Sequence, residues 1–403
     1  MINKISFRNF KVFKNWQTLE LKPITILIGK NNSGKSAVLK LMTLIEGALT
    51  SNEPQPINIV NDDIVIGNEY KDLVYGKFGR ALGIKLYQEN STTKDELSVE
   101  IAIDINKNEP ILDYWKLNNE LELVYLKNNI YENEKKGEYI CSFLGIQLIN
   151  YGAKEIPDIK VIRDNQLFDL HTDYIGSIRA KAQPYYDLKN GKSNKSKIDG
   201  INLYNFLIED YLSTDKKYFT QIAQWIKDKF EGWELCIDVD SEPYHIELRK
   251  GRLEVNLTET GMGIGQVLPL LTRAIKPCTE ETLIIIEEPE SHLHAYAHAQ
   301  LAQLFADSVK EDKNKKYLFE THSQNFVLRM RRLIAEGTLD CNDLGIYYVE
   351  FYEDKNESIL KEIKVNSLGK VDFWPEGIFS ETLEETIAIR TAQIDKENVG
   401  RTQ

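Results

Sequence analysis

Residues 24–42 read ITILIGKNNSGKSAVLKLM, and this stretch decides the fold. Its first five residues form a continuous apolar and β-branched run, as is typical of a strand buried on both faces of a sheet. From Ala37 onward, apolar residues recur at helical spacing. Between the two lies GKNNSGKS, which fits the pattern GxxxxGK[ST] in the strand-to-helix context that this pattern requires. The sequence therefore predicts an α/β fold with a phosphate-binding loop at residues 29–36, called the phosphate loop below.

The phosphate loop predicts an ATP site that needs Mg²⁺. Backbone N–H groups and the positive helix N-terminus hold phosphates without the help of side chains. Lys35 would neutralise the β and γ phosphates, and Ser36 would place its hydroxyl on Mg²⁺. A glycine-rich turn without a ligand is the alternative, which the strand before and the helix after disfavour. The ATP-binding residues predicted here are Gly29, Asn31, Asn32, Ser33, Gly34, Lys35, Ser36 and Ala37.

A second buried strand ends in two carboxylates, since residues 283–288 read LIIIEE. Acids at the carboxyl end of a strand in an α/β sheet lie at the edge where ligands bind. Glu287 would serve Mg²⁺ together with Ser36, and Glu288 would be the general base that orients the attacking water. Taken alone, two acids after a strand are better explained as exposed charges. The phosphate loop favours the catalytic interpretation.

Several segments resemble the RecF, SMC and OLD branch of ABC ATPases, and especially its smaller bacterial AAA-labelled members. EEPESHLHA at 287–295 resembles their Walker B and D-loop, and THS at 321–323 resembles their switch-histidine segment. TGMGIGQVLPLL at 260–271 resembles their signature loop. The opening ISFRNFKVF and the late segments GIYYVEF and WPEGIFSE resemble the two ends of the same proteins. The resemblance implies a two-lobed ABC head that hydrolyses ATP.

The resemblance also implies roles for single residues. His322 would sense the γ-phosphate as a third catalytic residue beside Lys35 and Glu288. The signature residues would approach the nucleotide of a second copy, which implies a homodimer or a higher oligomer; they are Gly261, Gly263, Gly265 and Gln266. Gly265 stands where relatives often have Ser. A glycine-rich turn before an apolar helix also offers free N–H groups to an anion, independently of any family. For the Q-loop the sequence offers only Asp72, as a weak candidate.

Length and pattern divide the chain into three parts. The chain has 403 residues, enough for two or three compact units. We expect the first lobe with the phosphate loop at 1–105, a strand-rich and helical insertion at 106–235, and the second lobe at 236–403. This second lobe would hold the signature, the acidic strand, the switch histidine and the C-terminal region. Residues 188–200, LKNGKSNKSKIDG, are expected to form a flexible loop.

Composition excludes several classes of protein. No apolar stretch approaches the ~20 residues of a membrane-spanning helix, and the N-terminus lacks the apolar run of a secretory signal. The four cysteines form no CxxC pair. We therefore expect a cytoplasmic protein without membrane contact. The net charge of −12 repels phosphate backbones, so nucleic-acid binding by the isolated chain would be weak and confined to a local basic patch.

Three features have alternative interpretations. His292, His294 and His298 cluster and offer a metal pair, although the motif already explains this segment. Residues 329–332, with three arginines, could face DNA or a partner, but a solvated helix face is the better explanation in so acidic a chain. Arg179 resembles an arginine that reaches the active site or dimer interface in relatives, and an ordinary surface salt bridge explains it equally well.

Two functions fit the predicted site. In the first, ATP-driven dimerisation gates a separate effector such as a nuclease, as in the Septu and retron-associated anti-phage ATPases that the sequence resembles. In the second, ATP turnover acts on DNA in repair or recombination, as in RecF and SMC proteins. We favour the first. No TOPRIM-like acidic cluster follows the head, so we expect no intrinsic nuclease. A transporter ATPase fits poorly, because its signature would lie closer to the phosphate loop than Gly261 lies to Gly29.

Overall fold

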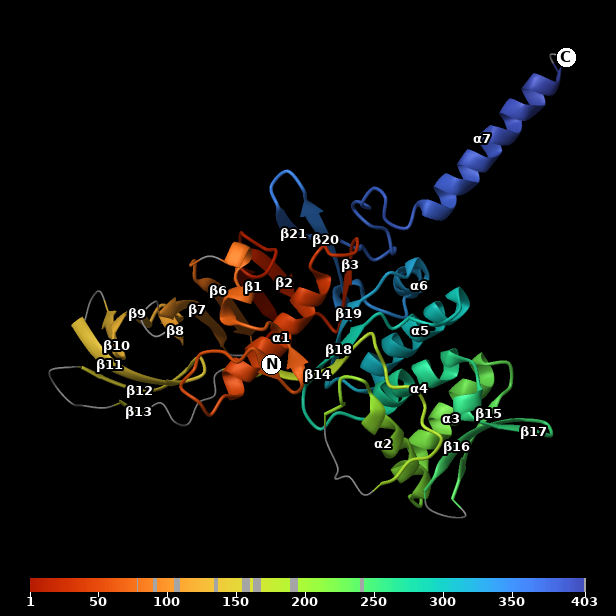
Figure 1. Cartoon of the computed structure of the whole chain (residues 1–403), viewed down its shortest axis with the longest axis horizontal. Helices are drawn as coiled ribbons and strands as arrows, with labels where there is room; N and C mark the ends of the chain where they lie inside the picture. The colour runs from red at the N-terminus through yellow and green to blue at the C-terminus, as the bar shows by residue number, and fades with distance from the viewer. Residues whose placement is uncertain are drawn as a thin grey trace.

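The computed structural model shows a mixed α/β molecule with two lobes and a projecting C-terminal helix (Figure 1). It describes residues 1–77, 79–89, 93–104, 109–133, 137–153, 160–161, 168–188, 195–239 and 243–401. Part of the expected flexible loop, residues 189–194, lies outside this set. Among the described residues, no helix combines the length and apolar character needed to cross a membrane.

A six-stranded sheet forms the centre of the molecule. In spatial order it contains β14 (His171–Ile175), β18 (Thr282–Glu287), β19 (Lys315–Glu320), β3 (Ile24–Ile28), β20 (Leu344–Tyr352) and β21 (Glu357–Ile363). The first five run parallel, and β21 pairs antiparallel with β20. The strands that the sequence predicted at 24–28 and 283–286 are therefore confirmed. Both end at the same edge of the sheet, because parallel strands share a direction.

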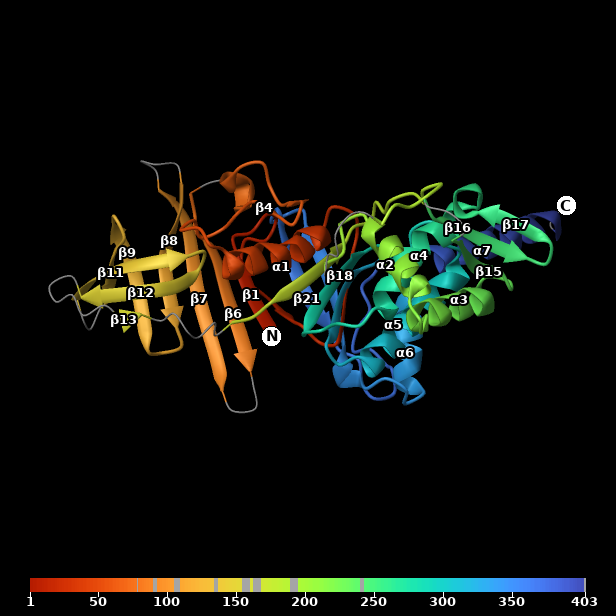
Figure 2. The same ribbon diagram turned by 90° about the horizontal axis from the view of Figure 1, so that it is seen from below.

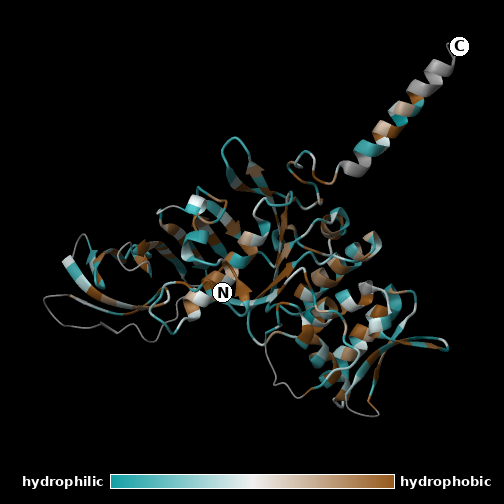
Figure 3. Ribbon diagram, viewed as in Figure 1, coloured by the Kyte–Doolittle hydropathy of each residue, from teal (hydrophilic) through white to brown (hydrophobic). Residues whose placement is uncertain are grey.

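The apolar runs of these strands serve two separate cores. Leu283 and Ile285 of β18 belong to the core shared with α1 (Lys35–Thr50), whereas Ile284 and Ile286 belong to the core on the other face. That second core also holds α4 (Met262–Ile275), α5 (Ala295–Glu311) and α6 (Gln324–Ala335). Helices on both faces explain why LIIIEE reads as a continuous apolar run and does not alternate. Figure 3 shows the hydrophobic segments, in brown, along the central strands and on the helices beside them.

A ten-stranded antiparallel sheet extends from the first lobe, counted over the described residues (Figure 2). Its spatial order is β13 (Lys160–Val161), β12 (Gln147–Ala153), β11 (Gly137–Leu144), β10 (Ile130–Asn133), β9 (Leu121–Lys127), β8 (Glu109–Leu117), β7 (Lys94–Asp104), β6 (Leu82–Glu89), β1 (Lys4–Arg8) and β2 (Gln17–Glu20). One face of β6 and β7 packs into the core with α1.

Helices and a small sheet cover the second lobe. The helices α2 (Ile201–Leu212) and α3 (Lys217–Lys229) pack on α4, beside a three-stranded sheet of β15 (Glu234–Asp238), β16 (His245–Lys250) and β17 (Leu253–Asn256). A short hairpin of β4 (Val60–Asn61) and β5 (Ile64–Val65) lies beside α1. The last helix, α7 (Glu381–Arg401), extends away from the body (Figure 1). The three-part division at 105 and 235 stays a prediction.

Candidate active site

The phosphate loop joins β3 to α1, and two of its positions require glycine. A Cβ atom on Gly29 would lie 2.4 Å from the carbonyl oxygen of Val349, which is backbone and cannot move aside. Gly34 has φ +104° and precedes the first residue of α1. A Cβ atom there would lie 2.6 Å from Cγ2 of Val12. The loop is therefore held closely between the turn after β1 and strand β20, in a conformation that other residues rarely adopt.

Lys35 lies at the centre of this loop with its ammonium group enclosed. Its Nζ donates to the carbonyl oxygens of Gly29 (3.0 Å) and Lys30 (2.9 Å), and the side chain is 3% exposed. Burial lowers the pKa of Lys35, and the neighbouring Glu320 carboxylate opposes that shift. An ammonium group that donates only to carbonyls of its own loop can exchange them for phosphate oxygens. The predicted position of Lys35 at the phosphates fits this geometry.

Three acids, Glu287, Glu288 and Glu320, lie at the same edge of the sheet. Glu287 ends β18 and lies in register with Glu320, which ends β19. Glu320 accepts a hydrogen bond from the hydroxyl of Ser36 at 2.7 Å, and its second oxygen lies 3.7 Å from Nζ of Lys35. Burial raises the pKa of Glu320, while Ser36 and Lys35 favour its charged form. Glu320 is a site residue that was not predicted from the sequence, although KYLFE ends in an acid as LIIIE does.

Glu287 faces away from the phosphate loop toward β14. One carboxylate oxygen accepts from the hydroxyl of Tyr174, and the other accepts from the backbone N–H of Ser177 at 3.1 Å. Burial, followed by the charge of Glu287, raises the pKa of Tyr174 well above its usual value, so the phenol stays protonated and donates. Both oxygens of Glu287 thus accept hydrogen bonds from β14 and the segment that follows it. Its role at the metal stays a prediction.

Glu288 begins a tight turn directly after the strand. It has φ +42°, its backbone N–H donates to the carbonyl of Glu320 at 2.8 Å, and its carboxylate accepts from the hydroxyl of Ser291 at 2.8 Å. The Glu288 charge acts on both Lys35 and His322, since it contributes to the pKa shift of each. This turn brings the predicted general base back over the site, near the phosphate-binding lysine.

Glu290 connects the acidic turn to the switch-histidine segment. It is 8% exposed and accepts from the hydroxyl of Thr321 at 2.7 Å and from the backbone N–H of His322 at 2.6 Å. Burial raises the pKa of Glu290, and these two hydrogen bonds oppose the rise. Burial, and then the charge of Lys35, lowers the pKa of His322. The backbone of His322 is therefore fixed by Glu290, and burial with the Lys35 charge favours the neutral form of its imidazole.

In the histidine cluster, the half-buried His298 has a structural role. The two ring nitrogens of His298 lie 2.8 Å from the hydroxyl of Ser323 and 3.0 Å from the carbonyl of Leu293. His292 and His294 are exposed. No group of three or more metal-ligating side chains is found within the part of the chain that the structure describes. The arrangement supports a tie between α5 and the switch-histidine segment more than a metal pair.

Arg179 is buried and is not part of a surface salt bridge. It is 4% exposed, and its guanidinium donates to the backbone carbonyls of Glu287 (3.4 Å), Glu288 (3.3 Å) and Ser291 (3.3 Å). Burial lowers its pKa, and the nearby acids Glu290 and Glu288 oppose that shift. Of the two interpretations of Arg179, the one that places it at the active site is supported, because it holds the backbone of the acidic turn.

The signature residues divide into an outer and an inner pair. Gly261 is exposed at the N-terminus of α4, and Gly263 follows it against the backbone of His292. Gly265 is buried and its carbonyl accepts from the hydroxyl of Tyr204 at 2.6 Å. Gln266 is 4% exposed and donates to the carbonyls of residues 179 and 180 at 3.5 Å. Only the outer pair is open to a second copy here, and the role of all four in trans stays a prediction.

Asp72, the weak Q-loop candidate, stabilises a local turn. Its carboxylate accepts from the backbone N–H groups of Asn68 and Glu69 and pairs with Lys77 at 2.8 Å. The Lys77 contact, followed by these backbone bonds, lowers the pKa of Asp72 to about 2. No contact of Asp72 with the site was found among these interactions, so the Q-loop assignment stays open.

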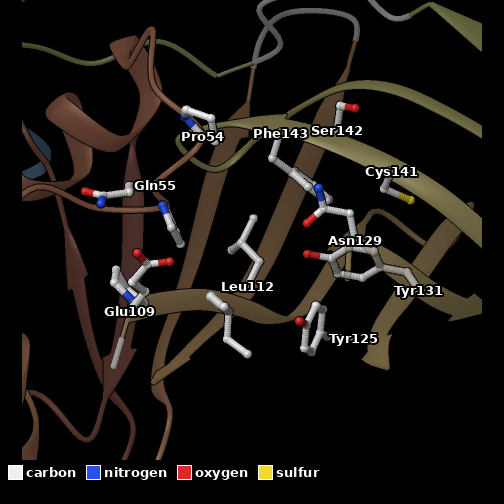
Figure 4. Close-up of a pocket in the computed structure, with 13 residues that line it drawn as sticks. Pro54, Gln55, Glu109, Leu112, Tyr125, Asn129, Tyr131, Cys141, Ser142 and Phe143 are labelled. Atoms are coloured by element: carbon white, nitrogen blue, oxygen red, sulfur yellow. The ribbon is translucent and has the colours of Figure 1, made fainter. Parts of the chain in front are cut away.

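A separate pocket of about 270 Å³ lies in the insertion (Figure 4). Tyr125, Tyr131 and Phe143 line it together with Pro54 and Gln55 of the segment after α1. None of the described residues that line it is Lys or Arg. The residues that line it do not include any of the phosphate loop, so this pocket is separate from the candidate active site.

Comparison with known families supports the resemblance. Residues 154–329 match the family described as "AAA domain, putative AbiEii toxin, Type IV TA system". Residues 339–388 match a family described as "Protein of unknown function (DUF3696)". Among curated proteins, none matches the chain at a significant level. The AAA match confirms the expected resemblance to AAA-labelled ATPases, and the parallel sheet in which β3 leads through the phosphate loop into α1 confirms the P-loop α/β fold.

Solved structures similar to this chain include heads of SMC proteins. The SMC head domain from Thermotoga maritima is 14% identical, with 90% of this chain and 99% of that chain covered and a TM-score of 0.44. An Smc head domain with an extended coiled coil, bound to the C-terminal domain of ScpA and derived from Pyrococcus furiosus, is 12% identical. In that comparison 96% of this chain and 99% of the other are covered, with a TM-score of 0.47.

Proposed function

We propose that this chain is a Mg²⁺-dependent ATPase whose nucleotide state controls assembly with a second copy and, through it, a separate effector. The observation that carries the proposal is the convergence of Lys35 and Ser36 with the acids that end β18 and β19. A buried cation and a hydroxyl on the loop, with carboxylates along the same edge of the sheet, suit a triphosphate and its metal. A structural role alone would not require three acids at one sheet edge.

The residues present fit Mg²⁺ and ATP. Mg²⁺ prefers oxygen ligands, and this edge offers the hydroxyl of Ser36 and the carboxylates of Glu287 and Glu320. When bound, the metal would neutralise charge on the β and γ phosphates. Lys35 would share that task, and Glu288, placed on its turn beside Lys35, would accept the proton of the attacking water. His322, neutral because burial lowers its pKa, can donate one hydrogen bond toward a phosphate oxygen.

Control of a partner effector is the biological role that we favour. The matched AAA family is described as a putative toxin of a type IV toxin–antitoxin system, which is a defence-like context. The exposed start of α4 at Gly261 provides free backbone N–H groups at a helix N-terminus, suited to the ATP of a second copy. On this basis we propose anti-phage defence with a separate nuclease as the effector.

Action on DNA is the second candidate, and the structure offers it less support. The three arginines of residues 329–332 are engaged within the chain. Arg329 donates to Gln303, Arg331 donates to the carbonyl of Gly369, and Arg332 pairs with Glu336 at 2.7 Å. Of the three, Arg332 is paired with an acid, and the net charge of −12 means that the molecule as a whole repels a phosphate backbone.

Lys35→Ala tests the ATPase proposal. The variant removes the cation from the phosphate loop, so ATP binding and hydrolysis should both collapse while the fold survives. Lys40→Ala on the same helix is a matched control, since Lys40 contacts only the carbonyl of Val65 at 3.4 Å. Isothermal titration with ATP and a phosphate-release assay measure the two effects. Unchanged hydrolysis in Lys35→Ala would refute the proposal.

A further inference from the structure

The three carboxylates of the site have different partners, and only one of them touches the phosphate loop. The two oxygens of Glu287 accept hydrogen bonds from the hydroxyl of Tyr174 and the backbone N–H of Ser177. Glu288 is bonded to Ser291 on its own turn. Glu320 alone accepts from Ser36 and lies beside Lys35. The acid that meets the predicted metal-binding hydroxyl is therefore not the one that the strand LIIIEE supplies.

Sheet order explains why Glu320 reaches this place. Strand β19 lies between β18 and β3, and Glu320 is in register with Leu27, near the end of β3. Glu287 is in register with Glu320 and lies one strand farther from β3, which is about 4.8 Å. A glutamate at the end of the intervening strand thus stands between Glu287 and the phosphate loop.

The hydrogen bond from Ser36 to Glu320 also sets the direction of the serine hydroxyl. A hydroxyl has one proton to donate and two lone pairs with which to accept. Because Ser36 gives its proton to Glu320, its lone pairs remain for a cation. Glu320 is 5% exposed, and a buried carboxylate is costly unless polar partners compensate it. Ser36 and Lys35 are those partners in the nucleotide-free molecule.

We infer that Glu320, more than Glu287, is the carboxylate that positions the hydroxyl of Ser36 for Mg²⁺. Glu287 then acts one step farther out, where Tyr174 and Ser177 hold it. This inference rests on the proposed ATPase function. Glu320 is a positioning residue for the metal, and its loss should weaken the contribution of Mg²⁺ to nucleotide binding while leaving Mg²⁺-free binding intact.

The test compares the affinity for AMP-PNP, a non-hydrolysable ATP analogue, with Mg²⁺ and with EDTA, by isothermal titration calorimetry. The ratio of the two Kd values is the Mg²⁺ gain. Glu320→Gln should lose about 10- to 100-fold of this gain, as is usual for groups that orient a metal ligand. Its Kd in EDTA should be unchanged or tighter, because a negative charge beside Lys35 is removed. Glu287→Gln should keep most of the gain.

A matched control is Glu46→Gln. Glu46 is also buried, at 3% exposure, and lies on α1 ten residues beyond Ser36, which is about 15 Å along the helix. It should leave the gain unchanged, although it loses contacts to Thr172 and Lys195. In a double-variant cycle, Ser36→Ala with Glu320→Gln should lose no more gain than Ser36→Ala alone, since Glu320 acts through the hydroxyl.

The outcomes separate the inference from the proposed function. A wild-type gain in Glu320→Gln, or a loss in Glu287→Gln as large as that in Glu320→Gln, overturns the inference alone. If the wild-type protein binds AMP-PNP neither with Mg²⁺ nor with EDTA, the ATPase proposal itself is overturned. If Glu320→Gln does not fold, Glu320→Asp gives the same comparison. It keeps the charge but withdraws the oxygen from Ser36, and it should lose the gain as well.

Discussion

Replacing Gly34 by alanine should disable the phosphate loop through two separable costs. The first is conformational, because φ is +104° at this position and a residue with a side chain there costs about 1–3 kcal/mol. The second is steric. The new methyl group would lie 2.6 Å from Cγ2 of Val12 and 3.0 Å from Cε2 of Phe13, and overpacking of this kind costs about 1–3 kcal/mol. Together they destabilise the protein by about 2–6 kcal/mol.

Two further variants separate these costs. Gly137 has φ +88°, and a Cβ atom there would meet nothing within 4 Å, so Gly137→Ala carries the conformational cost alone. Val12→Ala removes the methyl group that the Gly34→Ala side chain would strike, so Val12→Ala with Gly34→Ala should regain part of the lost ATP affinity. Urea denaturation measures the free energy of unfolding, and titration calorimetry with ATP measures the affinity.

Two results of these measurements would count against the explanation. If Gly34→Ala costs no more than Gly137→Ala and binds ATP as the wild type does, the contact with Val12 does not shape the loop. If Gly34→Ala loses affinity and Val12→Ala restores none of it, the loss arises from the backbone conformation alone. The steric half of the explanation would then be wrong.

Four other predictions concern the reaction, the core, pH and nucleic acid. Glu288→Gln keeps the acceptor for Ser291 but removes the base, so ATP should still bind while hydrolysis falls by about 10²- to 10⁴-fold, and light scattering should detect an ATP-dependent assembly. Arg273→Met leaves the buried Asp173 carboxylate without its counter-charge, with only Ser196 still donating to it, and should lower the free energy of unfolding by about 3–5 kcal/mol in urea titration, part of which Asp173→Asn should restore in the double variant. Burial lowers the pKa of His298 and His322, so the unfolded chain takes up protons at a higher pH than the folded protein does. The free energy of unfolding should therefore fall as the pH drops below about 6.5. His298→Gln should reduce that fall, as measured in denaturation series at several pH values. Duplex DNA binding in a fluorescence-anisotropy titration should be weak and should disappear with modest salt, and tight, salt-resistant binding would favour the DNA-acting alternative.

The parts of the fold that the sequence predicted are those with short-range causes. The spacing of apolar residues and the local motifs predict the strand at 24–28, the helix that follows and the acidic strand near 283–286. Lys35, Ser36 and Glu288 follow from the same local patterns. Their convergence at one edge follows because parallel strands between covering helices end together.

Glu320 and Arg179 were missed or left open because their roles depend on sheet order. No local pattern shows that KYLFE lies between the acidic strand and the strand before the phosphate loop. Arg179 likewise gains its role only when the segment after β14 crosses the acidic turn. Gln266 resembles a residue that faces outward to a second copy, yet tertiary packing turns it toward residues 179 and 180.

The ten-stranded sheet projects from the first lobe as a long arm. Seven strand-to-strand steps separate β1 from β12, and at about 4.8 Å each they form an arm of about 34 Å. Because β6 and β7 share a core with α1, a small tilt of that helix turns the root of the arm. A rotation of about 5° there sweeps the far strands through about 3 Å, more than enough to break a hydrogen bond. Mechanical amplification of this kind would turn a small movement at the phosphate loop into a larger displacement of the far strands of this sheet.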